Sequence, residues 1–412
     1  MNTLISPNSD ARQPDGRHLV EDVRFGALGF VVIDSTVNGS ATGGIRTVET
    51  LDGVDVEALA RVMTRKYSLL PFPRNGGAKG AVVIPRDATR QERVARLHAL
   101  GRELGPLIRT GSYLPWTDLR TDAEDIETVY RAAGRTPPEL GDTGIYTAYS
   151  VAGAGLAACD ILKLRPTETR AVIQGLGSVG AELAATLDRI GMRVIAAASS
   201  LGCLRAKDGL NLPGILARRK EIGDGWAREP ECGNADGPPL PAEDILNIEC
   251  DLFFPCAQEN AIDRHVARTL PARAVVPAAN EVGGPGAEEE LARRGVLFLP
   301  DFLVNAGGIL GSFLAGFGIP RKRLEEFELE VYRRLVHRLV ARAEAACETP
   351  YRHACSVADA RYEERARSSW CVRKIHGALY RLLRAPRLAR RLAGEVFLVA
   401  AGRSLNRRFT ES

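Results

Sequence analysis

The segment from Gly175 to Gly180, GLGSVG, restricts the fold more than any other part of this chain. It follows the apolar run AVIQ, precedes a stretch with helical periodicity, and is followed by a second apolar run, RVIAAASS. Glycines at this spacing between a strand and a helix are typical of a dinucleotide-binding turn, in which they allow the tight turn, the approach of the pyrophosphate and close packing of helix on strand. The free N–H groups at the helix start would face the phosphates. We therefore predict that the dinucleotide is bound by Gly175, Leu176, Gly177, Ser178, Val179 and Gly180.

The end of the second apolar run bears on which dinucleotide binds. An acidic residue about 20 positions after the first glycine commonly bonds the ribose 2′-hydroxyl of NAD. This chain has Ala198, Ser199 and Ser200 in that region instead. Ser199 can bond either a hydroxyl or a 2′-phosphate, and Arg205 follows shortly after. The sequence therefore leaves both NAD and NADP open as the cofactor.

Repeated alternation of strands and helices from Thr169 onward predicts a parallel, doubly wound sheet. A chain of 412 residues also exceeds what one hydrophobic core usually organises. We predict an α/β protein of two domains, an N-terminal α/β substrate and oligomerisation domain and a Rossmann-type dinucleotide-binding domain. The predicted segments are a flexible leader (1–20), the substrate domain (21–140), the Rossmann domain (141–325), helices returning to the first domain (326–370) and a basic amphipathic C-terminal extension (371–412).

Composition excludes several classes of protein. The net charge of +4 is too small to indicate a nucleic-acid partner. No apolar run approaches the ~18 residues that a membrane span needs, and the polar N-terminus lacks the features of a signal peptide. The cysteines form no CxxC pair and the histidines have no metal-ligand spacing, so we expect free thiols, no metal and a cytoplasmic location without stable membrane insertion. For the C-terminal extension we favour a solvated or subunit-interface helix over contact with an anionic membrane or nucleic acid.

Two lysines stand close together in the N-terminal third. Lys66 lies on the shoulder of the apolar stripe of an expected helix, and Lys79 lies in NGGAKG, a glycine-rich segment expected to be a loop. Two ammonium groups that converge on one pocket lower each other's pKa, so one can hold a carboxylate while the other acts as a base. For an arbitrary pair, surface positions are the simpler interpretation, and Asp118 alone would be an ordinary loop acid.

A series of short motifs gives these residues a context. In chain order they are GGIRT (43–47), MTRK (63–66), GGAKG (76–80), WTDLRTDAEDI (116–126), TAYSV (147–151), GLGSVG (175–180), PCAQEN (255–260), AAN (278–280) and PDFLVNAGG (300–308). In this order they resemble the glutamate/leucine/phenylalanine/valine dehydrogenase family. The N-terminal half looks most like the leucine dehydrogenase branch, and SLGCLRAKDGLNLPGILARRKE looks more like the glutamate branch. The resemblance implies NAD(P)-dependent oxidative deamination of an L-amino acid to the 2-oxo acid and ammonia, or the reverse, by a homo-oligomer.

The resemblance also implies roles for single residues. Lys66 would hold the substrate α-carboxylate, Lys79 would activate the hydrolytic water, and Asp118 would exchange protons with the leaving amine. Water must be excluded from this chemistry, so we expect a cleft between two domains that closes over the substrate. The nicotinamide end is assigned to Thr147, Asn280 and Asn305, and the substrate pocket to Thr42, Gly44, Trp116 and Asn305.

Three features depart from the family pattern. The spacing from Lys66 to Lys79 is one residue longer, and we favour a local bulge within residues 71–75 over a displaced Lys79, because a shift of ~1 Å can cost ~100-fold in rate. Thr42 stands where glutamate dehydrogenases carry a lysine for the side-chain carboxylate, which favours an apolar or aromatic substrate. Trp116 occupies a position that is usually small, so it narrows the pocket, stacks on an aromatic substrate or packs outward.

Two alternatives remain open from the sequence. One is glutamate dehydrogenase itself. The other is a catalytically silent, nucleotide-binding relative with a regulatory or structural role, which the extra loop residue and the missing ribose acid would fit.

Overall fold

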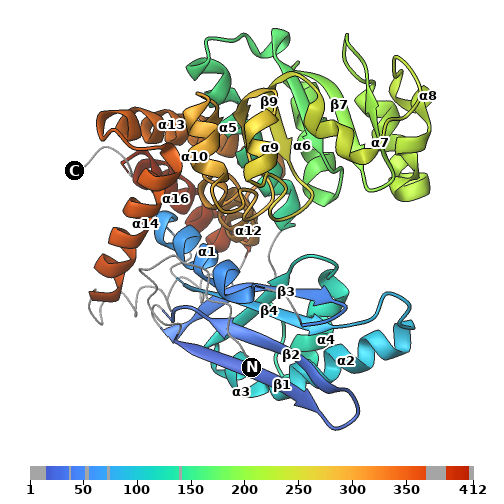
Figure 1. Cartoon of the computed structure of the whole chain (residues 1–412). Helices are drawn as coiled ribbons and strands as arrows, with labels where there is room; N and C mark the ends of the chain where they lie inside the picture. Colours follow the sequence, from blue (N-terminus) through green and yellow to red (C-terminus); the bar gives the residue numbers. More distant parts are fainter. Residues whose placement is uncertain are drawn as a thin grey trace. The chain divides into compact units, whose positions relative to one another are not determined.

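The computed structural model describes residues 15–36, 39–51, 55–71, 75–138, 142–367 and 387–407. The chain divides into two compact units, one of residues 1–67 and 74–138 and the other of residues 68–73 and 139–412. Each unit is built on one β-sheet, and Figure 1 shows helices on both of them. The predicted α/β class with two domains is thereby confirmed.

The first unit carries a mixed sheet of five strands in the order β1-β2-β4-β3-β5. Strand β2 is antiparallel to both β1 and β4, whereas β3 is parallel to β4 and β5. Its elements, in chain order, are β1 (Gly16–Asp22), β2 (Gly26–Ile33), β3 (Ala41–Val48), α1 (Val56–Leu69, whose last two residues fall in the second unit), β4 (Gly76–Val83), α2 (Arg90–Glu103), α3 (Gly105–Thr110), β5 (Tyr113–Thr117) and α4 (Ala123–Ala132).

Apolar residues on the two faces of this sheet explain the helix positions. On one face Val31 and Ile33 belong to a core that includes residues of α2, α3 and α4. On the other face Val32 and Ala81 pack with residues of α1. The alternation of side chains along a strand therefore places helices on both faces. Helix α4 begins with a capping box between Asp122 and Asp125.

The glycine-rich segments of the first unit are strands, and NGGAKG is therefore not the loop that the sequence suggested. Gly43 lies in β3, where a Cβ would come within 1.5 Å of the backbone oxygen of Ala78. Gly77 lies in β4, where a Cβ would meet the backbone nitrogen of Thr64 at 2.1 Å. These glycines admit close neighbours that no other residue would, which is a recognised use of glycine within strands. Tyr113–Thr117 forms strand β5, and Asp118, which would be an ordinary loop acid from the sequence alone, follows it directly.

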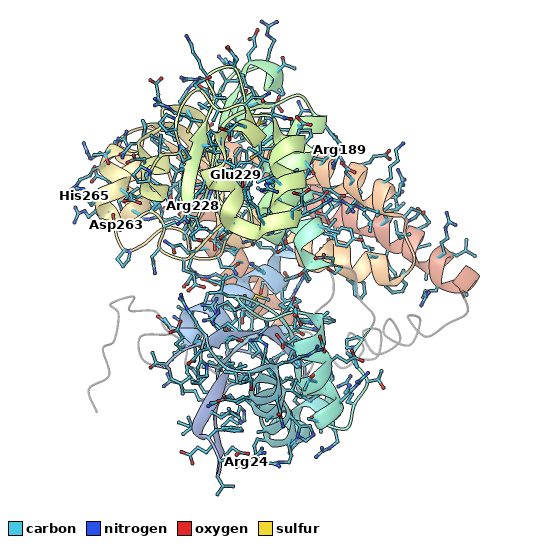
Figure 2. All side chains as sticks on the ribbon, turned by 90° about the vertical axis from the view of Figure 1, so that its right-hand side faces the viewer. Arg24, Arg189, Arg228, Glu229, Asp263 and His265 are labelled. Carbon is cyan, nitrogen blue, oxygen red and sulfur yellow. The ribbon has the colours of Figure 1, made fainter. Side chains whose placement is uncertain are left out.

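The N-terminal boundary also differs from the prediction. Strand β1 covers residues 16–22 and therefore includes the last five residues of the segment 1–20 that was expected to be a flexible leader. Its pairing with β2 accounts for the difference, because the partner strand supplies the backbone hydrogen bonds. The turn between β1 and β2 holds Arg24, labelled in Figure 2, whose guanidinium bonds the carboxylate of Asp22.

The second unit contains the dinucleotide motif and most of the helices. Its elements, in chain order, are α5 (Thr143–Ile161), η2 (Pro166–Glu168), β6 (Arg170–Gln174), α6 (Ser178–Arg189), β7 (Arg193–Ser199), β8 (Gly202–Arg205), α7 (Leu212–Ile222), η3 (Gly223–Arg228), α8 (Pro230–Gly233), η4 (Ala242–Asn247), β9 (Cys250–Pro255), α9 (Arg264–Thr269), β10 (Ala272–Val275), α10 (Ala287–Arg293), β11 (Leu297–Phe298), α11 (Asp301–Val304), α12 (Gly307–Gly316), α13 (Arg321–Ala345), α14 (Pro350–Arg367) and α16 (Arg387–Asn406).

The sheet of the second unit has the strand order β11-β10-β9-β6-β7-β8. All neighbouring strands are parallel except β8, which runs antiparallel to β7. The chain starts in the middle at β6, builds outward through β7, and then returns to build the other side from β9. This order reverses between β6 and β9, which is the switch point where doubly wound folds bind ligands. The predicted Rossmann-type sheet is confirmed.

The C-terminal helices pack within the second unit. Helix α13 runs against α5, and α16 packs on α12 and α13, with the ring of Phe397 5.1 Å from that of Phe317. The expected return of residues 326–370 to the first domain stays a prediction. Much of the predicted C-terminal extension, residues 371–386 and 408–412, lies outside the described residues. None of the helices in the described part of the chain has the length and apolar composition needed to cross a bilayer.

Candidate active site

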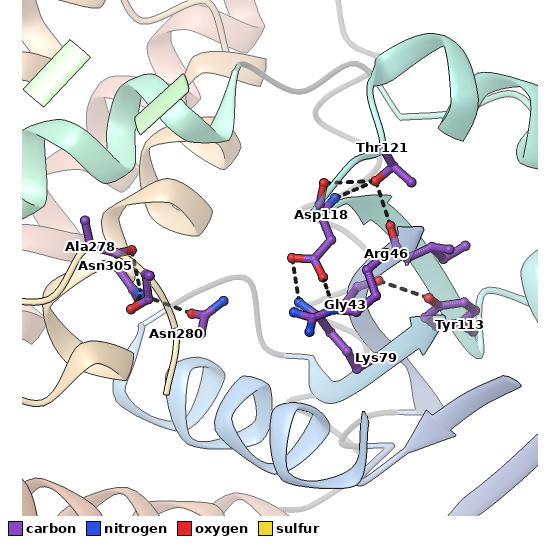
Figure 3. A network of polar contacts seen from close by, with 11 residues as sticks. Gly43, Arg46, Lys79, Tyr113, Asp118, Thr121, Ala278, Asn280 and Asn305 are labelled. Carbon is purple, nitrogen blue, oxygen red and sulfur yellow. Dashed lines mark hydrogen bonds and ion pairs between the residues drawn. The ribbon is translucent and has the colours of Figure 1, made fainter. Parts of the chain in front are cut away.

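In the first unit, a lysine and an arginine converge on one carboxylate. The ammonium nitrogen of Lys79 lies 2.9 Å from Oδ1 of Asp118, and Nε of Arg46 donates to Oδ2 at 2.9 Å. Figure 3 shows both contacts as dashed lines from the two carboxylate oxygens. The side chains of Lys79 and Arg46 are 3% and 7% exposed, and that of Asp118 is 14% exposed. The structure thus brings together the two residues that the sequence nominated as catalytic.

A threonine side chain holds the backbone at Asp118, just beyond the end of β5. The hydroxyl of Thr121 accepts a hydrogen bond from the backbone N–H of Asp118 at 2.8 Å and lies 2.7 Å from the backbone oxygen of Ile45, to which it donates. These bonds tie the end of β5 to β3 and fix the position at which the Asp118 side chain leaves the backbone. A carboxylate fixed in this way loses little conformational entropy when it meets a reactant.

The two cations decide the protonation state of Asp118. Burial by itself raises the pKa of the Asp118 carboxyl, but the charges and hydrogen bonds of Lys79 and Arg46 outweigh burial, so that this pKa lies below its ordinary value. Asp118 is therefore ionised at neutral pH and able to accept a proton. Nearby, burial raises the pKa of Tyr113, whose hydroxyl stays protonated and donates to the backbone oxygen of Gly43 at 3.1 Å.

The residues assigned to the substrate lie in the same unit, except Asn305, which belongs to the second unit. Thr42 is buried on β3, and its hydroxyl accepts a hydrogen bond from the side-chain amide of Asn75 at 2.6 Å. Trp116 is half-buried on β5, directly opposite Gly44 in the strand register. Lys66 is buried on α1, at 6% exposure. The predicted meeting of the Lys66 and Lys79 ammonium groups stays a prediction, and the bulge expected within residues 71–75 falls on residues 72–74, outside the described residues.

In the second unit, the three glycines of GLGSVG have three different surroundings. Gly175 has a positive φ of 96° and lies against Ala257, as the tight turn requires. A Cβ on Gly180 would come within 1.9 Å of the backbone oxygen of Gly175, so helix and strand touch here. A Cβ on Gly177 would meet nothing within 4 Å, which leaves open space beside the backbone. These surroundings fit the three roles of the glycines: Gly175 makes the tight turn, Gly180 lets the helix pack on the strand, and Gly177 lets the pyrophosphate approach the backbone.

Helix α6 begins at this turn without a side-chain cap. Gly177 is its N-cap residue and supplies no side-chain hydrogen bond to the first turn. The N–H groups of that turn therefore keep their capacity to bind an anion, and the helix dipole adds to it. Together with the open space at Gly177, this arrangement fits the pyrophosphate of a dinucleotide.

A second part of the expected cofactor site surrounds Asn305. Its side-chain amide donates to the backbone oxygens of Ala278 and Ala279 and to Oδ1 of Asn280, at 3.0–3.2 Å (Figure 3). The amide oxygen of Asn305 is buried and has no hydrogen-bond partner among the described residues. An acceptor left in this state suits a ligand with an N–H group, such as the carboxamide of nicotinamide. Thr147, on α5, instead donates to the backbone oxygen of Thr143 at 2.8 Å.

Comparison with known proteins identifies the family of this chain. The profile of the glutamate/leucine/phenylalanine/valine dehydrogenase family matches residues 142–366, more than half of the chain, and the profile of its N-terminal dimerisation domain matches residues 24–134. The chain belongs to this family. It is an NAD(P)-dependent amino-acid dehydrogenase, an oxidoreductase that acts on a CH–NH2 group, as the sequence predicted.

Two relatives of this amino-acid dehydrogenase in sequence are glutamate dehydrogenases. That of Thermotoga maritima is 31% identical over 304 residues, which cover 69% of this chain and 71% of that protein. The NADP-specific glutamate dehydrogenase of Saccharolobus shibatae is 30% identical over 295 residues, 67% of each chain. Among solved structures, the hetero-hexameric glutamate dehydrogenase from Thermus thermophilus, in a leucine-bound form, has a TM-score of 0.73 and 26% identity over 87% of this chain and 91% of that one.

Sequence reasoning about this amino-acid dehydrogenase missed two residues of the site. Arg46 bonds Asp118, and Thr121 anchors its backbone. Both lie inside the quoted motifs GGIRT and WTDLRTDAEDI, so a signal was present. It was not used because neither residue type points to deamination chemistry by itself, and their contact with Asp118 depends on strand pairing.

Proposed function

We propose that this dehydrogenase oxidatively deaminates an L-amino acid with an apolar or aromatic side chain, or catalyses the reverse reductive amination. The observation that carries the proposal is the contact of buried Lys79 with partly buried Asp118, two residues of opposite charge whose charged atoms lie 2.9 Å apart. Deamination requires a base that activates water and an acid that protonates the departing amine. This pair can supply both.

A proton that moves from the Lys79 ammonium to the Asp118 carboxylate creates both catalytic forms at once. The lysine becomes a neutral amine, which takes a proton from the water that attacks the substrate iminium carbon. The aspartic acid then gives its proton to the nitrogen that leaves as ammonia. Arg46 keeps its charge throughout, since a guanidinium does not deprotonate in proteins, and so stabilises Asp118 whenever it is ionised.

The second unit supports the cofactor part of the proposal. The GLGSVG turn and the uncapped start of α6 would hold the pyrophosphate, while Asn280 and Asn305 would hold the nicotinamide end, with Thr147 nearby in the family's assignment. When bound, the nicotinamide accepts the hydride from the substrate Cα. Asn305 keeps a fixed orientation through its three amide hydrogen bonds and presents its unpaired oxygen to the ligand.

The side-chain preference rests on Thr42. In glutamate dehydrogenases that this chain resembles, a lysine at this position neutralises the substrate's side-chain carboxylate. Thr42 is buried, uncharged and already bonded to Asn75, so a second carboxylate in this region would lose its hydration without gaining a charge partner. Trp116 adds apolar surface two residues before Asp118. Glutamate remains the second candidate, because the named relatives are glutamate dehydrogenases.

The test is a rate panel with purified protein. NAD or NADP is mixed with single L-amino acids at alkaline pH, and the absorbance of the reduced cofactor is followed. We expect turnover of apolar or aromatic amino acids, and a loss of at least ~100-fold in Lys79→Ala. Lys220→Ala, an exposed lysine of α7, is the matched control and should keep full activity. A response to glutamate alone would refute the side-chain preference, and no turnover with intact cofactor binding would favour the silent relative.

Assembly and location follow as parts of the same proposal. The match to the family's dimerisation domain and the hetero-hexameric assembly of the Thermus structure support an oligomer. We propose a homo-oligomer in the cytoplasm, with small molecules as its only ligands. Light scattering of the purified full-length chain would measure the subunit number.

A further inference from the structure

The carboxyl end of β7 lies beside the glycine turn. The backbone N–H of Gly175 donates to the backbone oxygen of Ala198 at 3.0 Å, and β7 is the neighbour of β6 in the sheet. In a doubly wound fold the adenine-side ribose of a dinucleotide lies at the end of this second strand. Ser199 and Ser200 follow Ala198 and therefore stand where the ribose 2′-position is expected.

An acidic residue from a distant segment is attached to both serines. The hydroxyl of Ser200 donates to Oδ2 of Asp224 at 2.8 Å, and the hydroxyl of Ser199 donates to the backbone oxygen of Asp224 at 3.1 Å. Asp224 lies in η3, which also packs on the β7–β8 hairpin, where a Cβ on Gly202 would come within 3.1 Å of the backbone oxygen of Ala227. Three separate contacts thus hold this segment at the end of β7, while the Asp224 side chain stays exposed.

These bonds change what the serines can offer to a ligand. Ser199 accepts from the backbone N–H of Leu201 at 3.1 Å, and its own proton goes to Asp224. The proton of Ser200 goes to the Asp224 carboxylate. Each hydroxyl carries one proton, so neither serine has a donor left for a phosphate oxygen. The region presents lone pairs and a negative charge, which suit a hydroxyl donor.

The sequence suggested Arg205 as a partner for a 2′-phosphate, but this residue does not lie at the carboxyl end of β7. Arg205 pairs with Ala196 in the β7–β8 register, three residues before Ser199. At a rise of about 3.3 Å per residue it lies roughly 10 Å back along the strand, away from the carboxyl end. Leu201, next to Ser200, is exposed but uncharged.

We propose that Asp224 is the ribose-binding acid of this enzyme and makes it prefer NAD over NADP. Its carboxylate accepts the hydrogen bond of the ribose 2′-hydroxyl, and the same carboxylate repels a 2′-phosphate in that place. The acid that is missing at the end of the second strand is thus supplied by a residue further along the chain. This inference rests on the proposed function only in that the GLGSVG turn binds a dinucleotide.

The test is a binding titration of the full chain with NADH and with NADPH, followed by the fluorescence of the reduced cofactor and without any amino acid. We expect NADH to bind at least about tenfold more tightly, since hydrogen bonds to charged groups and like-charge repulsion each reach this size. Equal binding, or tighter binding of NADPH, would overturn the proposal. Loss of that NADPH binding in Arg228→Ala would then identify Arg228, at the end of η3, as the phosphate-binding residue (Figure 2).

Variants separate the role of Asp224 from a general effect of charge. Asp224→Asn keeps the shape, removes the repulsion and adds an N–H donor, so the preference for NADH should fall by about tenfold or more. Asp208→Asn is the matched control, because Asp208 is exposed just beyond the other end of β8, and its ratio of affinities should equal that of the native chain. Asp224→Glu should keep most of the preference. An unchanged ratio in Asp224→Asn would refute the assignment.

The cofactor titration and the amino-acid rate panel test the role of Asp224 and the proposed function separately. A chain that prefers NADH in the titration but turns over no amino acid would contradict the deamination proposal alone. A chain that turns over amino acids equally well with NADP would contradict the role of Asp224 alone.

Discussion

Lys79 on β4 meets Asp118 at the end of β5 across an intervening strand, β3. Two strand spacings, about 10 Å, separate the backbones of β4 and β5. The side chains can meet because Gly44 lies between them and has no side chain. A Cβ on Gly44 would come within 2.7 Å of the Cβ of Asp118. Gly44, the second glycine of GGIRT, is therefore a structural requirement for the ion pair.

Replacing Gly44 tests this relationship. In Gly44→Ala the added methyl group would push Asp118 away from Lys79, and a displacement of about 1 Å costs on the order of 100-fold in rate. We expect kcat to fall by that order while NADH affinity stays unchanged, because the cofactor residues belong to the other unit. Initial rates and cofactor titration measure the two effects. A variant with native kcat would show that Asp118 does not depend on the missing side chain.

Arg46 should control the pH dependence of the reaction. Together with Lys79 it outweighs burial and keeps the pKa of Asp118 low. Arg46→Met removes one of the two positive charges that counter the effect of burial, so the pKa of Asp118 should rise. The acid limb of the kcat/KM profile should then move to higher pH. Arg46→Lys, which keeps the charge, should move it less, and equal profiles for all three proteins would contradict the role given to Arg46.

Two glycines of the GLGSVG turn should respond differently to the same change. A Cβ on Gly180 would overlap the backbone oxygen of Gly175, so Gly180→Ala should lower the stability of the second unit by about 1–3 kcal/mol. A Cβ on Gly177 meets no protein atom within 4 Å, and its φ of −67° suits alanine. Gly177→Ala should therefore change the Tm less than Gly180→Ala does, yet weaken NADH binding, because the methyl group occupies the space of the pyrophosphate.

Calorimetry and cofactor titration of the two variants check this pair of expectations. Similar losses of stability with unchanged NADH binding would contradict the assignment of Gly177 to the phosphate.

Glu328 on α13 should make the protein less stable as the pH rises. It is fully buried, both carboxyl oxygens lack a partner among the described residues, and a Cβ on Gly307 would come within 2.3 Å of one of them. Burial raises the pKa of Glu328 well above its ordinary value of 4.5. Between the two values the unfolded chain has lost the proton that the folded chain retains, so the free energy of unfolding falls with increasing pH.

Glu328→Met removes this dependence. We expect its Tm at pH 8 to exceed that of the native chain by about 1–2 °C, corresponding to roughly 1 kcal/mol for a unit of this size, and the gain to shrink toward pH 5. Glu326→Met, an exposed glutamate on the same helix, is the control and should change little at either pH. A gain of the same size at both pH values would show that packing, not the carboxyl, is responsible.

The sequence by itself determined the features that depend on neighbouring residues. The GLGSVG turn, its flanking strands and α6 are continuous in the chain, and the capping box of α4 involves only residues at the start of that helix. The order of the family motifs also identified the family, and the resemblance nominated Lys79 and Asp118 as catalytic residues.

Only the tertiary structure decided the features that depend on strand pairing. The glycine-rich segments of β3 and β4 have low intrinsic strand propensity, and they became strands because their neighbours pair with them and leave no room for side chains. The contacts of Arg46 with Asp118, and of Asp224 with Ser200, join segments that are remote in the chain. Such contacts are set by register and packing of distant elements, which no local pattern of residues encodes.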